Sequence, residues 1–444
     1  MSHTQEVSAR QILSLALPAL GVLAATPLYL LLDTGVVGHL GGFELAALAT
    51  GTAIQSQVTT QLTFLSYGTT ARAARLYGQG KRAAAVAEGV QATWVAVAVG
   101  LVLAAVVAAG APALATWLSG DSQLAAEAAR WMRVAAIAIP LTLVVMAGNG
   151  WLRGVQNTRT PLVFTLAGVI PGAVAVPLFV GAWGIVGSAW ANVLGVAVTA
   201  SCFVGALVRE RPEHWAPRWS VMKAQLVLGH DLIVRSASFQ VAFLSAAAVA
   251  GRFGAAALAG HQIMLQLWNF LSLVLDSLAI AAQALTGAAL GAGTVQRART
   301  VGVKVTQYSL VFAVVLAGVF VLGRTLIPRV LTNDDQVIAA VSGPWWLMIV
   351  MVILGGVVFA LDGVLLGASD AAFLRNATVV AALCGFVPGV WLAYVLDGGL
   401  TGVWCGLVAF MAIRLVAVVW RFWSMRWAVT DDGGSGAAGL ARKG

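Results

Sequence analysis

Residues 209–220 read Arg-Glu-Arg-Pro-Glu-His-Trp-Ala-Pro-Arg-Trp-Ser and form the only long polar break in the middle of this chain. On both sides of the break, apolar runs of roughly 20 residues recur, and each run is long enough to cross a bilayer as a helix. Of the 444 residues, 60% are hydrophobic and 10% are charged, whereas soluble domains carry about 25% charged residues. Membrane-spanning strands would show short alternating segments, and none is evident. The sequence therefore predicts an all-α polytopic membrane protein.

Hydropathy predicts about twelve transmembrane helices, six on each side of the polar break. We expect an N-lobe over residues 1–208, a cytoplasmic inter-lobe loop over 209–221, a C-lobe over 222–426 and a disordered tail over 427–444. The predicted spans are 11–38, 44–76, 83–110, 123–152, 160–181, 184–208, 222–250, 255–289, 298–323, 335–366, 372–396 and 400–424.

The two predicted lobes repeat each other at an offset of 213 residues, which becomes 215 near the end of each lobe. Gly38-His-Leu-Gly41 falls on Gly251-Arg-Phe-Gly254, and Asn149 falls on Asp362. Glycines that keep one offset through separate regions indicate a duplication. Because six is an even number, both lobes enter the membrane from the same side. Such repeats are related by an axis along the membrane normal, and two bundles of this kind can rock to give alternating access.

The net charge of +9 follows the loops and forms no long basic arm. Lys and Arg concentrate after the even-numbered spans, as at Lys81, Arg82 and Arg375. The excess of basic residues on cytoplasmic loops predicts a multi-pass plasma (inner) membrane protein with both termini in the cytoplasm. Nucleic-acid binding is not expected, because the basic residues have no surface on which to form a patch.

Motifs for catalysis or cofactor binding are not found in the sequence. There is no HExxH, no P-loop and no GxSxG in a strand-turn-helix setting. Cys202, Cys384 and Cys405 lie in apolar spans without metal-ligand spacing. We therefore expect no catalytic residue, no metal and no cofactor, and the chain must draw its energy from an ion gradient or a partner.

Asp33 is the outstanding polar residue of the first span, at the end of the apolar run from Ile12. A carboxylate inside hydrocarbon costs about 2.5–3.5 kcal/mol on insertion scales. Burial favours its protonated form and a nearby cation favours its charged form, so such an acid suits an ion-driven transporter. The alternative is a carboxyl that caps a neighbouring helix or pairs with Thr34. Tyr29 lies four residues earlier on the same face, and Pro27 should bend the span.

Four further stretches give the chain a specific resemblance. They are Leu32-Asp33-Thr34-Gly-Val-Val37-Gly38 with Leu45-Ala46-Ala47; Gly150-Trp-Leu152-Arg153-Gly154-Val-Gln156-Asn157-Thr158-Arg-Thr-Pro161; Arg252-Phe-Gly254-Ala-Ala-Ala-Leu258-Ala-Gly-His261-Gln262; and Leu275-Asp276-Ser-Leu-Ala279-Ile-Ala-Ala-Gln283. With these motifs in order on a duplicated frame, the chain resembles the multidrug and toxic compound extrusion (MATE) family. Within that family it is similar to the DNA-damage-inducible F-like (DinF-like) branch, over about residues 8–426.

The resemblance implies an ion-coupling site in the first lobe. It assigns the coupling role to Asp33 and places Tyr29, Asn149 and Asn192 near it, although Asn149 could equally cap a helix. Many relatives carry Asn and Asp in the fifth span, where this chain has Gly172-Ala-Val-Ala-Val176-Pro177. Sodium prefers several oxygen ligands, so the loss of an amide and an acid favours the proton over sodium.

A substrate cavity is predicted from polar and aromatic residues within spans. Polar side chains in a membrane helix belong in a bundle interior or a wet cavity, and tryptophan can stack on aromatic cations. Asp276 could instead bond across to a neighbouring helix. The candidate cavity residues are Gln57, Gln61, Tyr67, Trp268, Asn269, Asp276 and Gln283.

Three other acids are expected to serve structure. Asp362 lies at a helix end, Asp231 and Arg235 are four residues apart and should pair locally, and Glu88 should be interfacial near Arg82.

The resemblance implies secondary antiport of small organic, often cationic and amphipathic compounds against protons, in preference to sodium. The alternative is a lipid or lipid-linked oligosaccharide flippase of the related superfamily. The expected partners are organic cations and amphipathic drugs, protons or sodium ions, and membrane lipids. We expect a monomer.

Overall fold

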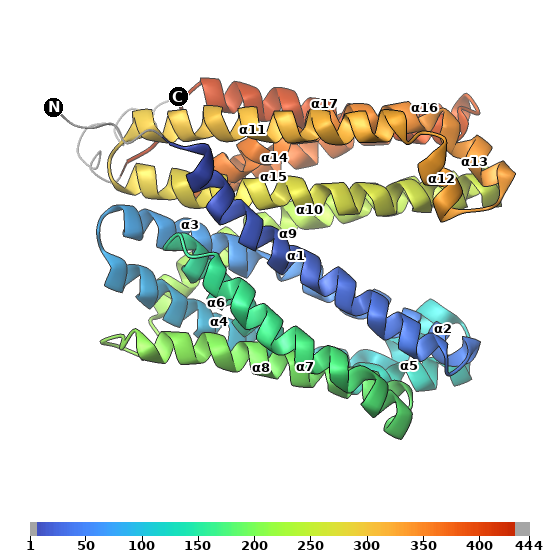
Figure 1. The fold of residues 1–444 in the computed structure, drawn as a ribbon, viewed down its shortest axis with the longest axis horizontal. Helices are drawn as coiled ribbons and strands as arrows, with labels where there is room; N and C mark the ends of the chain where they lie inside the picture. Colours follow the sequence, from blue (N-terminus) through green and yellow to red (C-terminus); the bar gives the residue numbers. More distant parts are fainter. Residues whose placement is uncertain (1–6, 431–444) are drawn as a thin grey trace. The chain divides into compact units, whose positions relative to one another are not determined.

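The computed structural model describes residues 7–430, which form helices joined by short turns, with no strand in that range (Figure 1). The N-terminal half contains α1 (Ala9–Gly38), α2 (Gly42–Gln61), α3 (Phe64–Gly78), α4 (Arg82–Ser119), α5 (Ser122–Ala135), α6 (Ala138–Gly154), α7 (Arg159–Trp183) and α8 (Ile185–Arg209). The C-terminal half contains α9 (Trp219–Arg252), α10 (Ala255–Gly291), α11 (Val295–Leu322), α12 (Leu326–Leu331), α13 (Asp335–Ser342), α14 (Pro344–Gly367), α15 (Ala371–Ala381), a π-helical turn (Ala382–Phe386), α16 (Val387–Val395) and α17 (Gly399–Trp423).

Ten of the described segments are long and apolar enough to cross a membrane, counting α15 to α16 as one. An eleventh is formed when α5 and α6, which meet at 45°, are taken as one bent span. The predicted span 44–76 is not among them, because it is divided into α2 and α3 at Leu62 and Thr63. The chain is therefore an all-α polytopic membrane protein.

Two compact units make up the chain. The N-terminal unit comprises Leu17–Gly229, and the C-terminal unit comprises Met1–Ala16 with His230–Gly444. Both divisions fall within helices, in α1 and in α9. In the N-terminal unit α7 packs along α8 and α4 along α6; in the C-terminal unit α14 packs against α10, α11 and α17.

The backbone repeats at the offset that the sequence predicts. Gly80 and Gly293 have φ of 75° and 73°, a left-handed conformation that glycine adopts without a steric cost. Gln156 and Ser369, separated by the same offset, have φ of 61° and 63° although neither is glycine. Each is followed by a matching hydrogen bond, Asn157 N to Leu152 O at 2.8 Å and Asp370 N to Leu365 O at 2.9 Å. The two halves are thus built on one duplicated helical plan.

One difference separates the repeats at their second span. α10 is continuous, whereas the matching N-terminal segment is broken between α2 and α3. Near the break, the Thr59 hydroxyl donates to the Gln55 carbonyl at 2.9 Å and the Thr63 hydroxyl to the Thr60 carbonyl at 2.9 Å. Hydroxyls that bond back to the preceding turn compete with the helix ladder and bend helices. Two such bonds lie at the break and favour a bend there.

The polar loop 210–218 is held against α4 within the N-terminal unit. Gln91 on α4 donates from Nε2 to the Ala216 carbonyl at 3.0 Å and accepts at Oε1 from the Arg218 amide at 2.7 Å. Trp94 Nε1 donates to the Trp215 carbonyl at 2.6 Å. The loop that divides the sequence into halves is therefore fixed to the first of them.

The predicted disordered tail lies largely outside the described residues, which end at 430. Among its first residues, Trp427 is buried; its ring stacks on Phe422 at 5.5 Å and its Nε1 donates to the Phe422 carbonyl at 2.9 Å.

Candidate ion-coupling site

Asp33 lies inside the N-terminal unit, with only 3% of its surface exposed. Ser188 Oγ on α8 donates a hydrogen bond to Asp33 Oδ2 at 2.8 Å, and Trp131 Nε1 on α5 donates to Ser188 Oγ at 3.3 Å. Both hydrogen-bonding side chains are buried. The three residues form a hydrogen-bonded chain that joins α1, α8 and α5. Asp33 thus pairs with Ser188 and not with Thr34.

A tight hairpin between α7 and α8 places Ser188. Gly184 turns the chain with φ of 66°, and Gly187 then lies against the end of α7. A Cβ at Gly187 would lie 2.0 Å from the Phe179 carbonyl oxygen. Only glycine permits this approach, and the next residue along the chain is Ser188.

Asp33 differs from the other buried carboxylates of the described residues in lacking an arginine partner. Glu88 and Asp362 are buried and each forms an ion pair with arginine. Asp33 accepts its hydrogen bond from a hydroxyl, and its second oxygen, Oδ1, is buried without a partner. A neutral carboxyl fits these surroundings without any counter-charge. A carboxylate here could bind a cation, because no arginine is paired with it.

Tyr29, Asn149 and Asn192 all lie in the N-terminal unit, but none of these described side chains is hydrogen-bonded to Asp33. The Tyr29 hydroxyl and Asn149 Oδ1 are buried without a partner. Asn149 lies within α6, well before its end at Gly154, so it is not a helix cap. Asn192 is half-buried on α8, one turn after Ser188. Their part in ion coupling stays a prediction.

Ser188 and Trp131 were not predicted from the sequence. Ser188 lies four residues before Asn192, so it shares a helix face with a residue that was singled out. No local pattern distinguishes it from other small residues of α8. Trp131 resembles the many tryptophans that are more simply read as membrane-interface residues.

The predicted cavity residues of the N-terminal unit lie on either side of the α2–α3 break. Gln57 is exposed and Gln61 is half-buried on α2, and Tyr67 is half-buried on α3. The neighbouring Gln55 donates from Nε2 to the Ala135 carbonyl at 3.0 Å, where α5 gives way to α6.

The predicted cavity residues of the C-terminal unit all lie on α10. Asn269, Asp276 and Gln283 are spaced by seven residues and so share a face. Asn269 is exposed, Asp276 half-buried and Gln283 buried. Trp268 is buried and packs on Phe359, with 6.3 Å between ring centres. No contact with a substrate tests these assignments, and they stay predictions.

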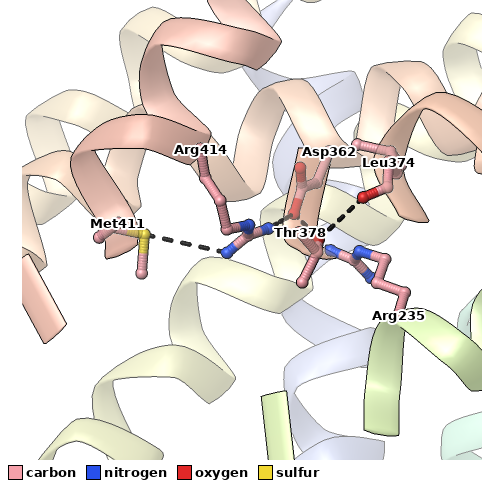
Figure 2. Close-up of polar contacts among 6 residues, drawn as sticks. All are labelled: Arg235, Asp362, Leu374, Thr378, Met411 and Arg414. Atoms are coloured by element: carbon pink, nitrogen blue, oxygen red, sulfur yellow. Dashed lines mark hydrogen bonds and ion pairs between the residues drawn. The ribbon is translucent and has the colours of Figure 1, made fainter. Parts of the chain in front are cut away.

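A buried charged cluster occupies the C-terminal unit (Figure 2). Asp362 on α14 accepts hydrogen bonds at Oδ2 from Arg235 on α9, at 2.5 Å, and from Arg414 on α17. Arg414 is 2% exposed and its guanidinium lies over the Phe239 ring at 4.5 Å. The cluster joins three helices and carries one more positive than negative charge. Arg414 is a buried span residue that the sequence analysis did not single out.

One expected ion pair and one expected position of a charged residue are wrong. Asp231 does not pair with Arg235; it binds Arg375 on α15, while Arg235 turns to Asp362. Glu88 is not interfacial near Arg82. It is buried, Arg72 binds it with hydrogen bonds of 2.8 and 2.9 Å, and Arg82 pairs instead with Glu210. In both cases the observed partner is a side chain brought close by the fold and not a neighbour along the sequence.

Comparison with known proteins decides the family. The MatE family model matches residues 18–178 and 232–391, which lie on the two repeated halves. The chain belongs to the multidrug and toxic compound extrusion family.

Relatives of this MATE protein cover most of its length. It is 32% identical to the Arabidopsis thaliana Protein DETOXIFICATION 44, chloroplastic, over 95% of this chain and 84% of that protein. It is 28% identical to the DNA damage-inducible protein F of Escherichia coli K12, over 92% and 91% of the two chains. It is 25% identical to the probable multidrug resistance protein NorM of Rhizobium meliloti, over 94% and 93%.

Solved structures share the fold. A MATE in the bent conformation superposes with a TM-score of 0.85 at 20% identity, over 94% of this chain and 96% of that one. A MOP superfamily transporter from Pyrococcus furiosus superposes with a TM-score of 0.84 at 20% identity, over the same shares. The chain is a membrane transporter of the MATE efflux family and not an enzyme.

Proposed function

We propose that this MATE protein is a secondary antiporter that exchanges protons for small organic, often cationic and amphipathic compounds, with Asp33 as the coupling carboxylate. The observation that carries the proposal is the state of Asp33. It is buried in a candidate membrane span, one oxygen is bonded to Ser188, and the other is without a partner. A buried acid without a counter-charge can gain or lose a proton without breaking an ion pair.

The surroundings of Asp33 favour the proton over sodium. A sodium ion needs several oxygen ligands, and the oxygen bonded to Asp33 is the single hydroxyl of Ser188. Gly172, at a position where many relatives carry a polar side chain, packs instead towards the Tyr29 ring, which would lie 3.4 Å from a Cβ there. A proton needs only one free carboxylate oxygen, which Asp33 Oδ1 supplies.

The proposed cycle couples this protonation to access. Asp33 takes a proton from outside, the first lobe rearranges and the substrate leaves. The lobes then rock inward, the proton is released and substrate rebinds. Protonation must stabilise the two states differently for coupling to follow. A proton that moves down 100 mV contributes about 2.3 kcal/mol.

The same proposal includes location and assembly. We place the protein in the plasma (inner) membrane with both termini cytoplasmic, because the basic loops follow the even-numbered predicted spans. We propose that it acts as a monomer, since each half already supplies a complete helical bundle.

Transport in vesicles tests the coupling role. The purified chain would be reconstituted into liposomes, and movement of a cationic dye would be followed after a pH gradient is imposed. Asp33→Asn should abolish gradient-driven dye movement, because an amide neither takes up nor releases the proton. Asp397→Asn is the matched control, because Asp397 is exposed in a loop. Dye movement that survives Asp33→Asn unchanged would remove the coupling role.

The same vesicles distinguish a proton from a sodium ion as the coupled ion, and a drug from a lipid-linked sugar as the substrate. A sodium gradient at constant pH should drive no dye movement, and a sodium-driven signal would replace the proton in the proposal. Movement of a lipid-linked sugar without movement of any dye would favour the flippase alternative, against which the match to the MatE family model counts.

A further inference from the structure

A surface groove of about 730 Å³ runs along the N-terminal unit between α5, α7 and α8. Its walls are mainly apolar and include Trp183, Val186, Trp190 and Ala197, and Arg130 adds a charged side chain. Trp183 and Trp190 are largely exposed in the isolated chain. In a protein that spans a membrane, an exposed apolar groove of this kind faces lipid.

The length of the groove matches the hydrocarbon thickness of one bilayer leaflet. Its lining follows α8 from Val186 to Ala197, a rise of about 16 Å at 1.5 Å per residue. The hydrocarbon core of a bilayer is about 30 Å thick, so half of it is about 15 Å. An acyl chain of one leaflet can therefore lie along the whole groove.

The charged side chain lies at the hairpin end of the groove. Trp131 Nε1 is bonded to Ser188 Oγ, so its neighbour Arg130 is level with the first turn of α8. Trp183 is the last residue of α7, at the same end. Tryptophan is enriched where hydrocarbon meets headgroups. The opposite end, at Val193 and Ala197, is aliphatic. The groove is thus charged at one end and apolar at the other, as a phospholipid is.

Arg130, the charged residue of the groove lining, has a carboxylate beside it that lies outside the lining, so both signs of charge are present near this end. Arg130 Nη1 donates to Glu127 Oε2 at 3.0 Å, so the pair is neutral overall. A guanidinium has five N–H donors, and Arg130 therefore keeps donors for a phosphate. Glu127 can accept hydrogen bonds from a primary ammonium. A trimethylated ammonium has no N–H group and cannot donate such bonds. A headgroup that carries phosphate and primary ammonium matches this pair better than a purely anionic one.

We propose that the groove binds one phospholipid of the phosphatidylethanolamine class. The phosphate lies on Arg130, the ammonium on Glu127, and one acyl chain follows Trp190 to Ala197. The buried faces of α5 and α8 carry Trp131 and Ser188, which form the hydrogen-bonded chain to Asp33. Lipid in the groove thus stabilises the helix pair that holds Asp33. Only this last consequence rests on the proposed role of Asp33.

Native mass spectrometry of the detergent-purified full chain tests the binding. Phosphatidylethanolamine, phosphatidylcholine and phosphatidylglycerol with identical acyl chains would be titrated separately. We expect one tightly held phosphatidylethanolamine, with five- to tenfold weaker retention of the other two, about the effect of one ordinary hydrogen bond at an exposed site. Arg130→Gln and Glu127→Gln should each remove this preference, and Trp190→Ala should weaken all three lipids alike.

Arg324→Gln is the matched control, because Arg324 is another exposed arginine, beside Trp346 in the C-terminal unit. It should leave the lipid preference unchanged. Glycerophosphoethanolamine, the same headgroup without acyl chains, should not displace the lipid. Preference for phosphatidylglycerol, equal retention of the ethanolamine and choline lipids, or full retention in folded Arg130→Gln would each overturn the proposal. Circular dichroism and size-exclusion chromatography establish that each variant is folded.

Discussion

At the scale of single residues, the buried carboxylates that the structure describes have two kinds of surroundings. Asp362 forms ion pairs with two arginines and Glu88 with one, and removing a partner from a buried ion pair leaves an uncompensated charge. Asp33 has only a hydroxyl beside it. Protonation of Glu88 or Asp362 would break an ion pair with arginine, whereas protonation of Asp33 would not. This contrast is the reason why we propose the coupling role for Asp33 and a structural role for the other two acids.

Ser188→Ala tests the hydrogen-bonded chain at Asp33. The change leaves Asp33 Oδ2 and Trp131 Nε1 without the partner that each has now. An unsatisfied buried polar group costs about 1–3 kcal/mol, so the melting temperature and the transport rate should both fall. Ser201→Ala on the same helix is the control, because that exposed hydroxyl bonds only to its own helix carbonyl at Ala197. Equal melting temperatures for the two variants would contradict the prediction.

Asp362→Asn tests the charged cluster. It removes the carboxylate that Arg235 and Arg414 share. Breaking a buried ion pair from one side costs about 3–5 kcal/mol, which should lower the melting temperature more than any other single change discussed here. Adding Arg414→Met removes one of the two unpaired charges and should restore part of the loss, a non-additive effect. Strictly additive melting temperatures would show that the contacts do not depend on each other.

At the scale of elements, close helix contact is set by glycine. The α7–α8 hairpin brings Gly187 against the Phe179 carbonyl, and the same hairpin presents Ser188 to Asp33 and borders the lipid groove. A single packing contact therefore supports two sites. In the C-terminal unit, the helix that matches α7 is interrupted by the π-helical turn at Ala382–Phe386, just before Pro388, whose missing amide interrupts the helix ladder.

Gly187→Ala and Gly181→Ala are a matched pair on this hairpin. A Cβ at 187 would lie 2.0 Å from the Phe179 oxygen, whereas nothing lies within 4 Å of a Cβ at 181. We expect Gly187→Ala to separate the helices, lower the melting temperature and impair transport. Gly181→Ala should be neutral or slightly stabilising, because alanine is favoured over glycine in helices by up to about 1 kcal/mol. Indistinguishable variants would mean that the hairpin relaxes at little cost.

At the scale of the whole molecule, the sequence predicted the helical membrane fold and its duplication. The constant offset between the halves could be found because turns that need a left-handed residue, such as Gly80 and Gly293, mark both of them. The partners of charged residues could not be found this way. Asp231 on α9 binds Arg375 on α15, 144 residues away, and no local spacing encodes that contact.

Sequence differences between the two halves bear on the number of protons that one transport cycle would carry. The position that matches Asp33 in the second half is Ala246, which has no charge. Asp362, which replaces Asn149 in the repeat, is held by two arginines. Among the buried residues that the structure describes, Asp33 is therefore the one carboxylate free of arginine. We therefore propose a single proton site, Asp33, among the residues that the structure describes.

One proton inward for one monovalent cation outward moves no net charge across the membrane. We therefore expect export of a monovalent dye to be insensitive to membrane potential at a fixed pH gradient. Export of a neutral substrate should accelerate as the potential drives the proton inward, because each 100 mV contributes about 2.3 kcal/mol per charge. Proteoliposomes with a potassium gradient and valinomycin set the potential, and dye fluorescence reports the rate. Acceleration of monovalent dye export by that potential would require a second proton per cycle, and with it a second titrating carboxyl, for which half-buried Asp276 on α10 would be the first candidate.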